Sequence, residues 1–166
     1  MAPRKKQDQK TNGELNTIDL GASIGLTLMK DATLAHVDEW LPTMMPSLDY
    51  ILGGGIPYGR VTEIYGKTAS GKSTLAVHLT KMAQTFGTVV IWVDIEGTAS
   101  PDNLEQLGVD LSTVFIYQPE EGDEITIEDV TEKIKEICAT FGPTGVPVLL
   151  IWDSLASTTT KQQQKE

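Results

Sequence analysis

The sequence predicts an α/β protein with three layers, in which helices cover both faces of a mostly parallel sheet. After residue 60, short apolar runs alternate with amphipathic stretches of helical length, which is the pattern of repeated strand–helix units. The runs at 89–93 and 148–152 are apolar at every position, as expected for strands that are buried on both faces. A chain of 166 residues is long enough for one such core.

Three segments are predicted before the regular pattern begins. Residues 1–16 are polar and are expected to form a flexible tail; the alternative is a basic arm that touches DNA. Residues 17–42 are mixed in character and are expected to be partly helical. The stretch 46–55 predicts a short helix that Ser47 caps and that a run of glycines ends.

Residue spacing defines the elements of the core. Leu75, Leu79 and Met82 share one face of a helix. Pro101 suits the first turn of a second helix, and Gly142 ends a third. We therefore expect helices at 73–86, 102–107 and 126–141, and strands at 61–65, 89–94, 114–117 and 148–152. The last residues, 157–166, are expected to form a frayed polar tail.

Composition narrows the function classes. The 13 Lys+Arg and 23 Asp+Glu give a formal charge of -10, which repels nucleic acid on average. The apolar runs are far shorter than the roughly 18–20 residues that span a bilayer, so no membrane partner is expected. Cys138 is the only cysteine, which excludes an internal disulfide and a cysteine-type zinc site. No secretory apolar region follows the basic start, and a cytoplasmic setting is favoured.

A phosphate-binding loop is the strongest signal in the chain. The segment GKTASGKS at 66–73 matches the pattern G-x-x-x-x-G-K-[ST] in full. Backbone N–H groups of such a loop, at the start of a helix, cradle phosphates. Lys72 would supply a cation to the β and γ phosphates, and the Ser73 hydroxyl would ligate Mg²⁺. The alternative is a glycine-rich turn with an exposed lysine. The predicted nucleotide-binding residues are Gly66, Lys67, Thr68, Ala69, Ser70, Gly71, Lys72, Ser73 and Thr74.

Carboxylates follow two of the predicted strands. Asp153 ends the apolar run 148–152, where an aspartate commonly holds Mg²⁺ in nucleotide-hydrolysing proteins; the alternative is an ordinary turn residue. Asp94 and Glu96 end the strand at 89–94. Because parallel strands end at one edge of a sheet, Glu96 would face the γ-phosphate and orient water. The alternative is that both are solvated loop carboxylates.

Other candidate residues favour structural roles. His36 and His78 have no partnered ligands, and His78 is expected on a helix surface. Cys138 lies on an apolar stripe and is expected in the core, as are Trp92 and Trp152. The acidic stretch 120–124 is expected to be a solvated loop.

An ordered series of short segments surrounds the phosphate loop. The segments are Pro46-Ser47-Leu48-Asp49, residues 52–60, residues 61–66, Val93-Asp94-Ile95-Glu96, Leu107-Gly108-Val109-Asp110, Gln118-Pro119 and residues 150–154. This series resembles the RecA family of DNA recombinases over residues 43–156. Phosphate loops are common to many nucleotide hydrolases, whereas the lead-in combined with LGVD and QP is shared by far fewer families. The divergence of the sequence from bacterial housekeeping members is compatible with a bacteriophage origin.

The resemblance implies a set of roles. Glu96 matches the catalytic glutamate that activates water, and Asp153 matches the metal-binding aspartate. Lys72, Ser73 and Thr74 match nucleotide-binding residues, with Lys72 stabilising developing charge. Members of the family hydrolyse ATP with Mg²⁺ between the subunits of filaments on single-stranded DNA. Residues 17–42 stand where the family has elements that dock on the neighbouring subunit, so they are expected to serve oligomerisation.

The sequence departs from the family pattern in two places, and each departure predicts a difference in function or fold. Ser100 and Asn103 stand where the family commonly has an aspartate and an aromatic residue near adenine, so relaxed adenine selectivity is expected. The family core also continues past the Asp153 strand, and its DNA-binding loops and one interior strand lie in that part. The resemblance therefore implies a partial ATP-binding core over residues 43–156, incomplete at its C-terminal side and marginal by itself.

Three functions are compatible with the sequence. The first is an ATPase of homologous recombination and DNA repair, or its N-terminal ATP-binding part. The second is a non-enzymatic nucleotide-binding module that associates with or caps an intact recombinase. The third is a RecA-like ATPase outside recombination, such as a replicative helicase. The lead-in and the LGVD segment favour the first.

Overall fold

The computed structural model describes residues 17–32, 36–97, 99–120 and 124–165. The chain divides into two units, Met1–His36 and Val37–Glu166. In the first, α1 spans Thr17–Ser23 and a 3-10 turn spans Met29–Asp31, which confirms that the segment is partly helical. The expected tail at 1–16 lies outside the described residues. No helix among the described residues is long and apolar enough to cross a membrane.

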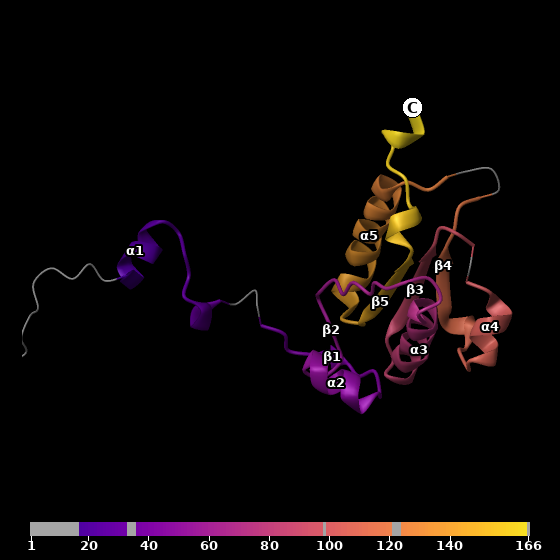
Figure 1. Cartoon of the computed structure of the whole chain (residues 1–166), viewed down its shortest axis with the longest axis horizontal. Helices are drawn as coiled ribbons and strands as arrows, with labels where there is room; N and C mark the ends of the chain where they lie inside the picture. The colour runs from indigo at the N-terminus through magenta and orange to yellow at the C-terminus, as the bar shows by residue number, and fades with distance from the viewer. Residues whose placement is uncertain (1–16, 33–35, 98, 121–123, 166) are drawn as a thin grey trace, which may run out of the picture. The chain divides into compact units, whose positions relative to one another are not determined.

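The central sheet of the second unit is parallel. Its strands are β3 (Val89–Asp94), β4 (Val114–Tyr117) and β5 (Val148–Asp153), in the spatial order β4-β3-β5 (Figure 1). In the β3–β5 register, Val89 pairs with Val148 and Asp94 pairs with Asp153. The acidic ends of these two strands therefore lie side by side, as the sequence predicts.

Helices cover both faces of this sheet. On one face, Val90 and Trp92 belong to a buried cluster with residues of α3 (Lys72–Thr85) and α4 (Pro101–Gln106). On the other face, Val93 packs with Val130 of α5 (Ile127–Phe141) and with Trp152. The three-layer α/β fold is confirmed. Shorter 3-10 turns lie at Leu111–Thr113, Gly142–Thr144, Leu155–Ser157 and Gln163–Lys165.

The lead-in to the core starts earlier than residue 43. A short antiparallel pair joins β1 (Trp40–Leu41) to β2 (Ile56–Pro57). Leu41 is 1% exposed and belongs to the cluster that faces α3. The boundary predicted at 42/43 therefore falls inside the packed unit, because the apolar Leu41 is buried with it.

Helix α2 (Pro46–Leu52) has the predicted end but not the predicted cap. Its N-cap is Met45, and Pro46 takes the first turn. Ser47 therefore does not cap it. Instead, the Asp49 carboxylate accepts a hydrogen bond from Thr43 N at 2.8 Å, and hydrogen bonds from Thr43 hold the pKa of Asp49 below its ordinary value. Gly53 ends the helix with φ 80°, which glycine adopts without strain.

The strand predicted at 61–65 is absent. These residues have no strand pairing, and their side chains are exposed, with Val61 at 99%. The pattern of β-branched residues that predicts a strand is present, but a strand also needs a neighbour for its N–H and C=O groups. Among the described residues, no strand pairs with this segment.

Two side chains lie elsewhere than predicted. Cys138 is exposed, because at 3.6 residues per turn it stands about 80° around α5 from the buried Val130. His78 is not a free surface residue, since its Nε2 lies 2.6 Å from the Thr43 carbonyl oxygen. The core positions of Trp92 and Trp152 are confirmed, with Trp92 at 2% exposure and Trp152 half-buried.

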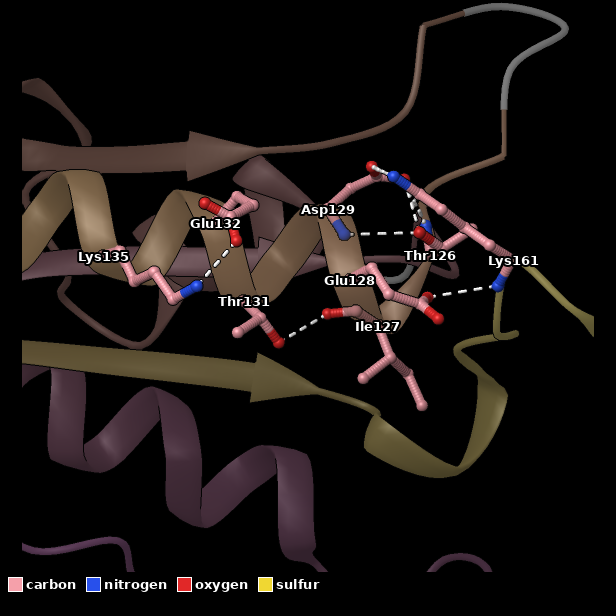
Figure 2. A network of polar contacts seen from close by, with 8 residues as sticks. All are labelled: Thr126, Ile127, Glu128, Asp129, Thr131, Glu132, Lys135 and Lys161. Atoms are coloured by element: carbon pink, nitrogen blue, oxygen red, sulfur yellow. Dashed lines mark hydrogen bonds and ion pairs between the residues drawn. The ribbon is translucent and has the colours of Figure 1, made fainter.

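The residues after β5 return to the start of α5 (Figure 2). Lys161 Nζ lies 2.8 Å from Asp129 Oδ1. In addition, Ile127 N donates to Thr159 O at 2.9 Å. Thr158 is 7% exposed. The frayed tail predicted at 157–166 is therefore wrong for residues 158–164. Glu124 of the predicted acidic loop is exposed, and residues 121–123 of that loop lie outside the described part.

Candidate nucleotide site

The phosphate loop lies directly before the N-terminus of α3. Gly71 is the N-cap with φ 92°, and Ala69 also has a positive φ of 60°. Ser70 N donates to Lys67 O at 3.2 Å, which closes a turn within the loop. A depression on the surface is lined by residues 69–74. The first backbone N–H groups of a 14-residue helix have no partner in its own ladder and carry positive partial charge, so this depression favours an anion.

Lys72 folds back over this loop. Its Nζ donates to the carbonyl oxygens of Gly66 and Lys67, each at 3.2 Å. The ammonium group is thereby held above the loop rather than extended into solvent. Phosphate oxygens are stronger acceptors than these two carbonyls because they are charged, so an arriving phosphate would replace them as partners.

Ser73 and Asp153 meet at the mouth of the loop although 80 residues separate them in sequence. The Ser73 hydroxyl donates to Asp153 Oδ2 at 3.0 Å. A hydroxyl and a carboxylate are hard oxygen donors of the kind that Mg²⁺ takes, with its remaining positions filled by water and phosphate. No described group of three or more His, Cys, Asp or Glu side chains could hold a metal by itself. The two residues therefore fit a metal that arrives with a phosphate ligand.

Glu96 lies near the same strand ends. It is exposed, and its Oε1 accepts a hydrogen bond from Ser154 Oγ at 3.3 Å. Ser154 follows Asp153 directly, so this bond ties Glu96 to the residue next to the predicted metal ligand. An exposed carboxylate at this position can accept a proton from water.

Asp94 has a different environment from Glu96. It is completely buried, and its Oδ2 accepts bonds from Ala99 N at 2.9 Å and Gln118 Nε2 at 3.0 Å. The interpretation of Asp94 as a solvated loop carboxylate is wrong. These hydrogen bonds of Asp94 were not predicted from the sequence. The available signal was the polar Gln118, immediately after the neighbouring strand.

Ser100 and Asn103 border the same region. They line a second depression with Thr74, Trp92 and Ala99. Ser73 and Asp153 also contribute to its wall. The two depressions share Ser73 and Thr74. Polar, uncharged side chains therefore stand beside the phosphate loop where the resemblance expects the adenine.

The model of the RecA N-terminal domain matches residues 15–164 of this chain. The chain belongs to the RecA family. It is 40% identical over 126 residues to the protein RecA of Bartonella quintana, covering 75% of this chain and 34% of that protein. It is 38% identical over 133 residues to the protein RecA of Chlorobaculum tepidum, covering 80% and 36%. The chain therefore spans about a third of the length of these curated RecA relatives.

One solved structure is also similar to this RecA-family chain. The crystal structure of the RadB recombinase superposes with a TM-score of 0.49 at 29% sequence identity. The superposition covers 76% of this chain and 56% of that structure.

Proposed function

We propose that this chain is the ATP-binding and ATP-hydrolysing part of a RecA-family recombinase. In this proposal it acts in the cytoplasm with single-stranded DNA, in homologous recombination and DNA repair. One observation carries the proposal: the Ser73 hydroxyl stands 3.0 Å from the Asp153 carboxylate at the mouth of a phosphate loop. The LGVD and QP segments support recombination over other RecA-like ATPases.

Binding begins at the loop. The backbone N–H groups at the start of α3 receive the β and γ phosphates, and Lys72 exchanges its two carbonyl partners for phosphate oxygens. Ser73 and Asp153 would hold the metal, which when bound would supply positive charge to offset that of the phosphates.

Hydrolysis requires a water in line with the bond to the leaving group. Glu96 orients that water and accepts its proton as the water oxygen bonds to the γ-phosphorus and the bond to the β–γ bridging oxygen breaks. The electron pair of that bond leaves with ADP. Lys72 stabilises the charge that develops on the transferred group. Ser154 holds Glu96 beside β5 until the substrate arrives.

Filament formation and DNA binding belong to the same proposal. They are supported by membership in the RecA family and by the segment at 17–42, which has exposed apolar side chains such as Ile18, Leu20 and Met29. A formal charge of -10 gives no general attraction to DNA, so DNA contacts would be local.

The test is ATP turnover by the purified chain, with and without single-stranded DNA. We expect Mg²⁺-dependent turnover that Lys72→Ala abolishes while the thermal midpoint stays near that of the parent. Lys81→Ala, a lysine on the exposed side of the same helix, is the matched control and should retain turnover. Equal turnover in the Lys72→Ala variant would reject the assignment.

A second candidate is a nucleotide-binding module that associates with an intact RecA relative without turnover. The exposed apolar segment at 61–65 favours it, because Val61 and Tyr65 are 99% and 87% exposed. This candidate predicts that the chain inhibits the ATPase of an intact relative at substoichiometric ratios. No inhibition at equimolar addition would count against it.

A further inference from the structure

The loop that carries Glu96 is fixed at both ends. At its start, Ile95 N donates to Asp153 O at 3.3 Å, which extends the β3–β5 pairing by one bond. At its end, Ala99 N donates to Asp94 Oδ2 at 2.9 Å. Between these two bonds, Glu96 and Gly97 are exposed. Ile95 and Ala99 are therefore two points at which the chain on either side of Glu96 is held.

Asp94 joins this loop to the neighbouring strand. The oxygen that accepts from Ala99 N also accepts from Gln118 Nε2 at 3.0 Å. Gln118 comes directly after β4, whose last residue, Tyr117, pairs with Val93 of β3. One carboxylate at the end of the central strand thus ties together the ends of β3 and β4 and the far end of the Glu96 loop.

The burial of Asp94 makes these bonds important. A carboxylate taken out of water is costly unless donors replace the lost solvent. Asp94 is 0% exposed, and its Oδ2 accepts from both Ala99 N and Gln118 Nε2. Loss of the Ala99 or the Gln118 donor would weaken the hydrogen bonding that offsets the burial of this carboxylate, so both donors are held to Asp94.

We propose that Asp94 is a positioning residue, which fixes the Glu96 loop through Ala99 and is itself held by the Gln118 amide. The inference rests on the proposed function, because Asp94 affects hydrolysis only if Glu96 orients the attacking water. Asp94 touches no substrate. It sets where Glu96 stands relative to Ser154 and the end of β5.

The test uses the whole chain, three variants and one control variant. Asp94→Ala removes the acceptor of the bonds from Ala99 N and Gln118 Nε2. Asp94→Asn keeps an oxygen that can accept both, and is the conservative rescue. Gln118→Met changes an exposed side chain of similar length, so it removes one donor with little risk to folding. Gln106→Met, an exposed glutamine on α4, is the matched control.

Two readouts separate positioning from a merely structural role. The first is the hydrogen-exchange rate of the Ala99 amide, which we expect to rise about tenfold in Asp94→Ala and severalfold in Gln118→Met. The second readout compares ATP turnover at saturating MgATP with the dissociation constant for MgATP. Turnover should fall about tenfold in Gln118→Met, because a displaced Glu96 loop no longer holds the attacking water in line. The dissociation constant should stay within about twofold, because the phosphate loop is unchanged. Asp94→Asn should remain close to the parent in both.

Each outcome decides the inference. Unchanged exchange at Ala99 in Asp94→Ala and Gln118→Met would overturn it. Faster exchange with unchanged turnover in a parent that hydrolyses ATP would overturn the positioning role. A parent that binds MgATP without turnover would contradict the proposed function instead, and the exchange rates at Ala99 would then decide the inference alone.

Discussion

At the scale of residues, the site depends on side chains that two distant segments bring together. Lys72 and Ser73 come from the start of α3, whereas Asp153 comes from the end of β5. The hydrogen bond between Ser73 and Asp153 already holds the two oxygen atoms proposed as metal ligands 3.0 Å apart. The free chain therefore holds its proposed metal ligands close to where they are needed, which limits reorganisation on binding.

Glu96 provides the sharpest test of the hydrolytic step. Glu96→Gln keeps the size of the side chain and removes its basicity, so turnover should fall by about 10²–10⁴-fold. The dissociation constant for MgATP should change little, because the phosphate loop is untouched. Single-turnover hydrolysis and fluorescence titration measure the two quantities. Glu105→Gln, an exposed carboxylate on α4, is the control, and equal losses in both variants would contradict the role of Glu96.

Asp153 should govern the metal dependence of binding. With Asp153→Asn, the Ser73 hydroxyl keeps an acceptor but the site loses its negative charge, so Mg²⁺ should strengthen ATP binding much less than in the parent. Binding of ATP in EDTA should be similar in both proteins. Titration calorimetry with and without Mg²⁺ measures this difference. A variant whose binding depends on Mg²⁺ as the parent's does would exclude Asp153 as a ligand.

At the scale of elements, the start of α5 is held by its own cap and by the returning C-terminal segment (Figure 2). Thr126 Oγ1 accepts from Asp129 N at 3.2 Å, and Asp129 Oδ2 accepts from Thr126 N at 3.0 Å, a reciprocal capping box. Lys161 adds an ion pair to Asp129, and its backbone N donates to Glu128 Oε2 at 3.1 Å. The hydrogen bond from Lys161, with those from Thr126, lowers the pKa of Asp129 to about 2.

This arrangement predicts a pH dependence of stability. Because the folded-state pKa of Asp129 lies below its ordinary 3.8, its contribution is complete above about pH 4 and is lost as pH falls through about 2. Lys161→Met should therefore lower the urea midpoint near pH 6, and the difference from the parent should shrink towards pH 2. Lys135→Met, which removes the exposed pair with Glu132, should show a smaller effect. A difference that does not change with pH would contradict the ion pair.

Elements with local sequence signals could be predicted, whereas those that depend on tertiary neighbours could not. Strand 89–94 and the start of β5 could be predicted closely, because continuous apolar runs and their acidic ends are local signals. Residues 61–65 have the composition of a strand, but strand formation depends on a partner that local sequence does not reveal. The contacts of Asp94 and Lys161 depend on tertiary neighbours, so the sequence offered only weak hints of them.

At the scale of the whole molecule, the sheet has an open side. Among the described strands, β5 forms one edge, and the exposed segment 61–65 pairs with no described strand. An unpaired edge together with exposed apolar residues promotes association between chains. The net charge of -10 opposes this association, so we expect it to be stronger in high salt.

Sedimentation velocity tests this expectation. The chain should show a larger weight-average sedimentation coefficient as its concentration and the salt concentration rise. A double variant, Val61→Lys with Tyr65→Lys, should reduce that increase, whereas Thr131→Lys on the exposed side of α5 should reduce it less. A chain that stays monomeric at every concentration and salt level would show that neither the β5 edge nor the segment 61–65 promotes association.

The proposed hydrolysis depends first on the binding of ATP with Mg²⁺ by residues 66–74 and Asp153. The most direct measurement is equilibrium binding of a fluorescent ATP analogue to the parent chain and to Lys72→Ala, with and without Mg²⁺, after circular dichroism has shown that both are folded. We expect Mg²⁺-dependent binding by the parent that weakens at least about tenfold in the variant. A folded parent that does not bind, or a variant that binds equally well, would contradict it.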